Sequence, residues 1–181
     1  MIPRFQACMV FVLAREGGWS DNPSDSGGAT MYGIIQREYD AYRRAKGLPE
    51  QTVRLISIAE REEIYRDNYW EPVHGDYLDS PVDMVMFDSA VNTGIGQAIK
   101  WLQTALGIIV TRQFDTDTSD AYHTYIAAHG AQPLAEAILR QRVAFYQWLG
   151  ENKPGDETFE SGWLNRVNLL EQACNLPITV Q

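Results

Sequence analysis

Apolar residues recur at helical spacing along most of the chain, and short polar or glycine-rich segments separate one apolar stretch from the next. In the first stretch Phe5, Met9 and Val12 fall on one side, which predicts a helix from about residue 3 to residue 16. The same reasoning predicts helices over 36–46, 57–69, 80–92, 99–106, 133–150 and from 162 onward. Only residues 27–35 break the pattern, and their tight turn predicts a hairpin. The sequence therefore indicates a mainly α-helical fold with a small β-hairpin after the first helix.

One of these predicted helices is apolar nearly all round over residues 84–92, so it should form the buried centre of the fold. It carries Asp88 and Asn92, which are four residues apart and therefore lie on one face. Buried polar groups need partners, so these side chains either hold neighbouring backbone or line a cleft and hold a sugar or the hairpin. A glycine-rich segment follows, and it predicts a boundary between residues 1–94 and residues 95–181, two lobes packed as one unit.

The stretch from residue 16 to residue 34 holds five of the chain's 14 glycines and the best candidates for chemistry. Gly17 and Gly18 should end the first helix, which places Glu16 at its last turn. The negative end of the helix dipole and the apolar helix wall both disfavour an ionised Glu16, as a general acid requires. Asp25 lies in a polar loop and should stay ionised. Two carboxyl groups in unlike environments are typical of divided acid and base roles.

The spacing adds a geometric argument. Asp25 follows Glu16 by nine residues and Thr30 follows Asp25 by five. If the hairpin folds back beside the helix end, Asp25 and Thr30 lie across a gap from Glu16, with room for a sugar ring and a water. Taken alone, Glu16 is better explained as a solvated helix-end charge, Asp25 as a turn former and Thr30 as a strand residue. That explanation gives no reason for the glycine-dense hairpin.

The order Glu-Gly-Gly, then Asn-Pro-x-Asp-x-Gly-Gly-x-Thr-x-x-Gly-Ile, resembles the signature of glycoside hydrolase family 108. That family comprises phage endolysins and secretion-linked muramidases with a lysozyme-like fold, and the resemblance makes Glu16 the catalytic acid. The Glu, Asp, Thr order is also similar to the triad of phage-type lysozymes, whose last gap is one residue longer. It implies that Asp25 and Thr30 position water. The candidate substrate-binding residues are Tyr32, Asp88 and Asn92.

The resemblance continues along the chain at 87–94 and at 162–167, where the order Gly-Trp-x-x-Arg is similar to the family's closing segment. It implies that residues 1–94 form the catalytic lobe and that the rest resembles a predicted peptidoglycan-binding domain. Residues 113–120 depart from that pattern and are interpreted as a solvated loop with a helix cap. Trp163 and Arg166 are three apart on a helix, so they can stack, and a clamp between lobes is favoured over a sugar contact.

The net charge of −9 argues against nucleic acid, because no basic stripe is available to displace counterions. It also weakens attraction to an anionic wall, so recognition of peptidoglycan would rest on hydrogen bonds and aromatic faces. Cys8 and Cys174 are expected to be free thiols, although a disulfide is possible. With no apolar span and no signal peptide, we expect a cytoplasmic monomer without membrane insertion, which needs a holin or similar route to the cell wall.

The resemblance implies cleavage of the β-1,4 bond between N-acetylmuramic acid and N-acetylglucosamine, without a cofactor. A zinc amidase is not favoured, because His74, His123 and His129 form no metal-binding pattern. Two alternatives stay open. A lytic transglycosylase also uses one Glu but needs no water-holding Asp, so Asp25 with Thr30 favours hydrolysis. A non-catalytic wall-binding or secretion-accessory protein would keep the shape without needing an acid. The sequence leaves open whether the role is host lysis or secretion.

Overall fold

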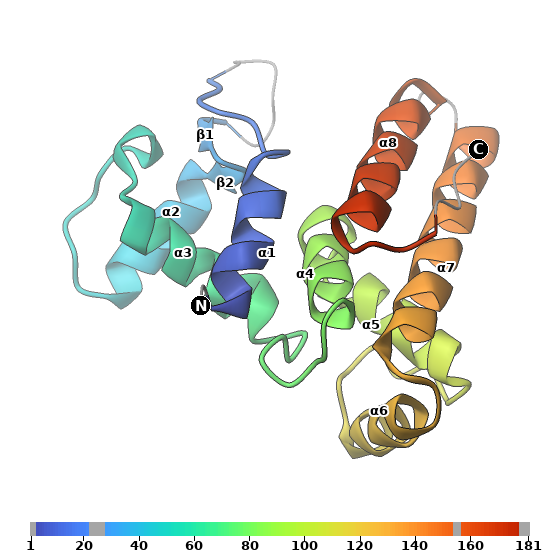
Figure 1. The fold of residues 1–181 in the computed structure, drawn as a ribbon. Helices are drawn as coiled ribbons and strands as arrows, with labels where there is room; N and C mark the ends of the chain where they lie inside the picture. Colours follow the sequence, from blue (N-terminus) through green and yellow to red (C-terminus); the bar gives the residue numbers. More distant parts are fainter. Residues whose placement is uncertain (1–2, 22–27, 154–156, 178–181) are drawn as a thin grey trace.

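A computed structural model of the chain describes residues 3–21, 28–153 and 157–177. In this part of the chain, helices form two groups, and two short strands lie beside the first helix (Figure 1). The elements are α1 Arg4–Leu13, β1 Thr30–Met31, β2 Ile34–Ile35, α2 Gln36–Ala45, η1 Val53–Leu55, α3 Ile58–Tyr65, η2 Arg66–Trp70, α4 Val82–Thr93, α5 Ile95–Leu106, α6 Thr116–His129, α7 Ala131–Asn152 and α8 Glu157–Ala173. The predicted mainly α-helical fold with a small hairpin is confirmed.

The first group contains α1, the hairpin, α2 and α3. The two strands pair antiparallel, with Thr30 opposite Ile35 and Met31 opposite Ile34. Their turn needs left-handed backbone at both central positions, Tyr32 with φ of 53° and Gly33 with φ of 75°. This tight turn brings the hairpin back against the end of α1, as the sequence predicts.

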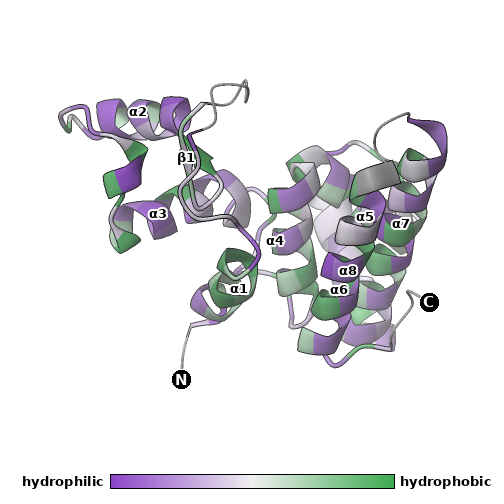
Figure 2. Ribbon diagram, turned by 90° about the horizontal axis from the view of Figure 1, so that it is seen from above, coloured by the Kyte–Doolittle hydropathy of each residue, from purple (hydrophilic) through white to green (hydrophobic). Residues whose placement is uncertain are grey.

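The second group is built around α4, whose residues Val85, Met86, Phe87 and Ala90 are fully buried. This confirms the predicted central helix. It packs against α5 and α7 on one side and against α1 on the other, and α8 packs along α7. Seen from above, α1 of the first group lies beside α4 of the second group, where the two groups meet (Figure 2). Both groups therefore share α4 as a common wall.

Aromatic rings strengthen the junction between α1 and α4. Phe5, Trp70 and Phe87 meet edge to face, with ring centroids 5.4–5.8 Å apart. Such pairs add about 0.5–1.5 kcal/mol each beyond the burial of their area. The division at residue 94 stays a prediction, because Gly94 separates α4 from α5 while α4 packs with both groups.

Several helix ends differ from the sequence prediction. The first helix ends at Leu13, and the N–H groups of Arg15 and Glu16 bond back to the carbonyl of Val12, which leaves Glu16 just beyond the helix. The last helix begins at Glu157, five residues earlier than predicted. In contrast, Asp115 caps α6 through the N–H of Thr118, as the interpretation of this loop expected.

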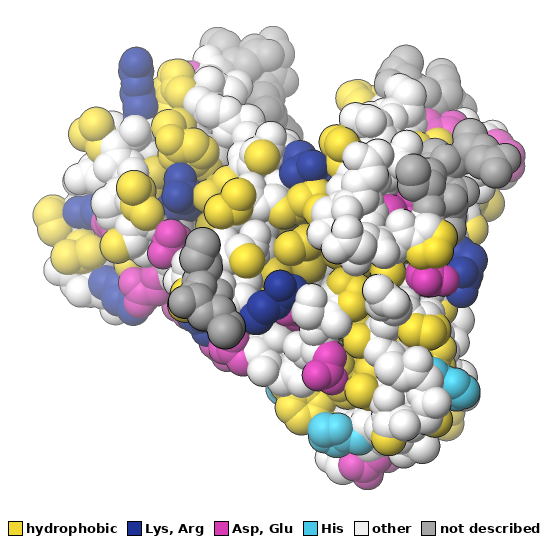
Figure 3. Space-filling view, in the orientation of Figure 1, with side chains coloured by type: hydrophobic (Ala, Val, Ile, Leu, Met, Phe, Trp, Pro, Cys, Tyr) yellow, Lys and Arg dark blue, Asp and Glu magenta, His cyan; other side chains and the backbone are white. Residues whose placement is uncertain are grey.

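Cys8 and Cys174 are both buried free thiols. Burial raises the pKa of each to about 12, so neither is a ready nucleophile. Among the described residues, no helix is long and apolar enough to cross a membrane. In the space-filling view the surface is hollowed between the two groups of helices, and hydrophobic and basic side chains lie in the hollow (Figure 3).

Candidate active site

Glu16 lies directly after α1, where the chain turns toward the hairpin, and its side chain is 18% exposed. One carboxylate oxygen, Oε2, faces the hairpin turn. A Cβ added at Gly33 would lie 3.0 Å from this oxygen and 3.0 Å from the hydroxyl of Tyr65. Tyr65 in turn donates a 2.7 Å hydrogen bond to the carbonyl of Tyr32. The turn is thus fixed from α3, and its glycine leaves room for the Glu16 carboxylate.

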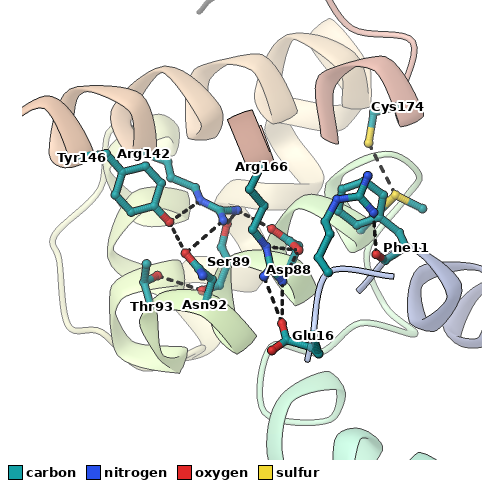
Figure 4. A network of polar contacts seen from close by, with 12 residues as sticks. Phe11, Glu16, Asp88, Ser89, Asn92, Thr93, Arg142, Tyr146, Arg166 and Cys174 are labelled. Atoms are coloured by element: carbon teal, nitrogen blue, oxygen red, sulfur yellow. Dashed lines mark hydrogen bonds and ion pairs between the residues drawn. The ribbon is translucent and has the colours of Figure 1, made fainter. Parts of the chain in front are cut away.

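The other carboxylate oxygen of Glu16, Oε1, is bonded from the opposite group of helices. Arg166 on α8 donates to it from both terminal nitrogens, each at 3.0 Å. The same guanidinium donates to Oδ1 of Asp88 on α4 through Nε at 2.9 Å. Figure 4 shows Arg166 pointing from α8 toward both carboxylates. Arg166 therefore joins the two sides of the hollow.

The Asp88 carboxylate is fully buried and is shared by a second arginine. Arg142 on α7, also fully buried, donates to Oδ2 of Asp88 at 2.7 Å. Its neighbours Tyr146 and Asn92 close the network, since the Tyr146 hydroxyl donates to Oδ1 of Asn92 and accepts from Nε of Arg142 at 2.9 Å. Because Asp88 is fully buried, a ligand in the hollow could contact Arg166 but not Asp88 itself. Asn92, in contrast, lines an open pocket.

The electrostatics follow from this arrangement. Burial opposes the charge on Asp88, yet the two arginines hold the pKa of this carboxyl below its usual range. Burial also opposes the charge on Arg166, and Asp88 and Glu16 outweigh it, so the pKa of Arg166 is raised. On the hairpin side, burial and the nearby Glu16 raise the pKa of Tyr65. Tyr65 therefore stays a neutral hydrogen-bond donor.

Two further predicted residues, Thr30 and Tyr32, lie in the hairpin. The Thr30 hydroxyl donates to the carbonyl of Gly28 at 3.0 Å and keeps its oxygen available as an acceptor. Tyr32 is partly exposed, and the Arg61 guanidinium lies 4.8 Å from its ring centroid. Asp25, the predicted base, lies outside the described residues. Its position relative to Glu16 stays a prediction.

A pocket of about 270 Å³ opens beside the Glu16–Arg166 pair, lined by residues from α4 and α8 and by Arg15. Trp163 forms part of its wall. The indole stacks on Tyr146, with centroids 5.2 Å apart and planes 26° apart, and no contact of its ring with Arg166 is found in the described part of the chain. Residues 1–94 are joined to the rest of the chain by Arg166 and also by Arg142, which both bond to Asp88. Within the described ranges, no group of three or more potential ligand side chains could hold a metal ion.

Comparison with known families agrees with this geometry. The sequence profile of glycosyl hydrolase 108 matches residues 9–94, which contain Glu16, the hairpin and α4. Among solved structures, the chain is similar to SagA of Brucella abortus, with 29% sequence identity and a TM-score of 0.75. The similarity covers 94% of this chain and 93% of that one. A comparison with curated proteins finds no match.

The sequence analysis missed three residues around Glu16. Arg166 was considered only as a partner of its helical neighbour, and the pairing with Glu16 joins residues 150 positions apart. No sequence motif marks Tyr65 as a site residue. Glu38 is a further carboxyl group near this site. Burial raises the pKa of Glu38, and burial together with the charges of Glu38 and Glu16 raises the pKa of Tyr69.

Proposed function

We propose that this chain is a peptidoglycan hydrolase of the N-acetylmuramidase type, with Glu16 as the general acid. One observation carries the proposal. A partly exposed carboxyl group stands in the hollow between two groups of helices, with one oxygen fixed by Arg166 and the other facing the hairpin turn at Gly33. A glycoside hydrolase needs such a fixed acid beside an open groove.

The two oxygens of Glu16 suggest how the proton is directed. Both donors of Arg166 go to Oε1, so the proton of the acid form belongs on Oε2. From there it would pass to the glycosidic oxygen of a glycan strand lying between the hairpin and α8. A positioned acid contributes typically 10²–10⁴-fold to such a reaction. The proposed bond is the β-1,4 bond between N-acetylmuramic acid and N-acetylglucosamine in the bacterial cell wall.

The second half of the proposed mechanism is the attacking water. Asp25 would act as the base, and the Thr30 hydroxyl would supply a second hydrogen bond to the water. The hydroxyl of Thr30 already bonds to the backbone next to its own hairpin, which orients its oxygen. Tyr32 and Asn92 are proposed to contact the sugar from opposite sides of the hollow.

The test is clearance of purified peptidoglycan sacculi by the purified chain. Glu16→Gln keeps the size of the side chain but cannot donate the proton, so clearance should fall by roughly 10²–10⁴-fold. Glu50→Gln, at an exposed loop position, is the matched control and should clear normally. Equal thermal unfolding midpoints of the two variants would exclude a folding defect.

Three outcomes would redirect the proposal. A Glu16→Gln variant that clears sacculi at the rate of the unmodified chain removes Glu16 from the chemistry. Products lighter by one water identify a lytic transglycosylase instead of a hydrolase. Binding to sacculi without any clearance supports the non-catalytic alternative.

A further inference from the structure

The pocket beside Glu16 is rich in positive charge, although the whole chain is acidic. Arg142 and Arg166 pair with Asp88, Arg166 also pairs with Glu16, and Arg15 lies on the pocket wall together with Arg166. The formal net charge of the chain is −9, so a local excess of arginine stands out. Asp88 is fully buried and already bonded to two arginines. The excess charge is therefore concentrated at the two arginines that reach the open pocket.

Of these three arginines, Arg15 has no carboxylate partner among the described residues. Its Nη1 donates to the carbonyl of Phe11 at 2.6 Å, and its guanidinium carbon lies 3.5 Å from the centroid of the Phe11 ring. These contacts fix the guanidinium group without neutralising it. Over residues 3–21, 28–153 and 157–177, no ion pair involves Arg15, and its buried Nε has no hydrogen-bond partner. Burial lowers its pKa, as expected for a guanidinium that lacks an adjacent anion.

The rest of the pocket suits a ligand that is anionic at one end. Arg15 and Arg166 lie on its wall together with the amide side chains of Asn92 and Asn165. Trp163 adds an aromatic face, held in place by its stacking on Tyr146. Arginine presents a planar set of donors that matches a carboxylate, and amides bond to sugar hydroxyl and acetamido groups.

We infer that this pocket binds a carboxylate of the peptidoglycan substrate between Arg15 and Arg166, next to the glycosidic bond whose oxygen Glu16 would protonate. The inference rests on the proposed function and adds the group that is recognised. Peptidoglycan offers this chemistry in two places. One is the lactyl carboxyl of a muramic acid that carries no peptide, and the other is a free carboxyl of the peptide stem.

The inferred site also addresses a difficulty in the mechanism. A general acid must carry a proton, whereas an arginine pairs best with a carboxylate that has none. A substrate carboxylate that accepts from Arg166 would take one of the two donors now bonded to Oε1 of Glu16. The other donor would still orient Oε1, and the weakened ion pair would let Oε2 carry a proton while the glycan is bound. A substrate without a carboxylate would leave the pair intact.

Binding measurements test the site independently of catalysis. In NMR-monitored titrations, N-acetylmuramic acid or N-acetylmuramyl-L-alanyl-D-glutamate should bind at least about tenfold more tightly than N-acetylglucosamine, because charged hydrogen bonds are the stronger ones. The two acidic compounds distinguish the sources, since the lactyl carboxyl is free in the first and blocked in the second. Tighter binding of the dipeptide compound assigns the stem carboxyl, and tighter binding of the free acid assigns the lactyl group. Affinities of both acidic compounds equal to that of N-acetylglucosamine would overturn the inference.

Variants then locate the carboxylate. Arg15→Gln should weaken binding of the acidic sugars about tenfold and leave N-acetylglucosamine unchanged, whereas Arg15→Lys should keep intermediate affinity because it keeps the charge. Arg140→Gln, on the exposed face of α7, is the matched control and should change nothing. Selective binding that survives in Arg15→Gln would also overturn the inference.

Clearance assays separate this inference from the proposed function. With sacculi as substrate, Arg15→Gln should raise KM more than it lowers kcat, since Arg15 binds and does not react. If the unmodified chain clears no sacculi, the hydrolase proposal fails while the titrations still decide the carboxylate site. If it clears sacculi but binds acidic and neutral sugars equally, only the carboxylate site fails.

Discussion

Arg166 divides one guanidinium group between Glu16 and Asp88, which lie 150 and 78 residues away in sequence. Asp88 is buried in the centre of the fold, and Glu16 stands at the edge of the hollow. Arg166 therefore ties the Glu16 side chain, which lies beyond the end of α1, to the buried helix α4.

The first prediction concerns the close approach of the hairpin turn to Glu16. Gly33→Ala places a Cβ 3.0 Å from Oε2 of Glu16, so we expect clearance of sacculi to fall at least about tenfold as the carboxyl group is displaced. Gly47→Ala is the matched control. Its φ of 66° carries the same backbone strain of about 1–2 kcal/mol, but nothing lies within 4 Å of the added atom. Equal losses in both variants would attribute the effect to strain alone.

The second prediction concerns Arg166. Removing one member of a mostly buried ion pair typically costs about 3–5 kcal/mol, so Arg166→Met should lower the free energy of unfolding by that amount in urea titrations. Arg166→Lys should lose less stability but still lose activity, because one ammonium cannot reproduce the fork that serves both carboxylates. Arg140→Met removes an exposed pair with Glu136 and should cost under about 1 kcal/mol. Matching losses at both positions would contradict the role of the network.

The third prediction is acid sensitivity. The pKa of Asp88 is depressed in the folded protein, because its two arginines outweigh its burial. The stability that this carboxylate contributes is fully present above its unfolded pKa of about 3.9 and is lost as pH falls through the folded value. The unmodified chain should therefore lose unfolding free energy steeply below about pH 4.

Asp88→Asn provides the comparison for this pH dependence. It should be less stable near pH 7, because Arg142 keeps its burial and loses its carboxylate. Below about pH 4 its stability should fall less steeply than that of the unmodified chain, since one titrating group is gone. Parallel curves for the two proteins would show that Asp88 does not dominate the acid response.

The fourth prediction concerns the proposed water. If Asp25 and Thr30 hold it opposite Glu16, the carboxyl groups stand roughly 6.5–9.5 Å apart and the reaction inverts the anomeric centre. Thr30→Ser keeps the hydroxyl and should keep much of the activity, whereas Thr30→Val and Asp25→Asn should lose most of it. Proton NMR of the fresh product, read before mutarotation, should show the α-anomer first. A β-anomer would indicate a retaining mechanism.

The sequence was most informative where the determinants are local. The capping box of Ser57 and Glu60, the glycine after Leu106 and the uniform apolarity around Phe87 each fix an element through neighbouring residues. The hairpin follows from its glycines in the same way. The end of the first helix was placed three residues late, because Glu16 still bonds back to the helix without belonging to it.

The site was only partly predictable for the same physical reason. Glu16 is marked by a motif, but its partner comes from α8, and no spacing rule relates residues so far apart. Trp163 and Arg166 are neighbours on their helix, yet each finds a stronger partner elsewhere. The indole stacks on Tyr146, and the guanidinium pairs with carboxylates. The contacts of these side chains depend on residues distant in sequence, and the spacing of residues within one helix cannot predict such contacts.

The distance along the chain between Glu16 and Arg166 has a consequence for the order of events in refolding. Contacts of high sequence separation must await loop closure, so helices of each group can form before this pair does. A refolding chain would pass through a stage with most of its helical signal and an incomplete site. After dilution from urea, the proposed clearance of sacculi should therefore return more slowly than ellipticity, and the interval between them measures how late the two groups of helices dock.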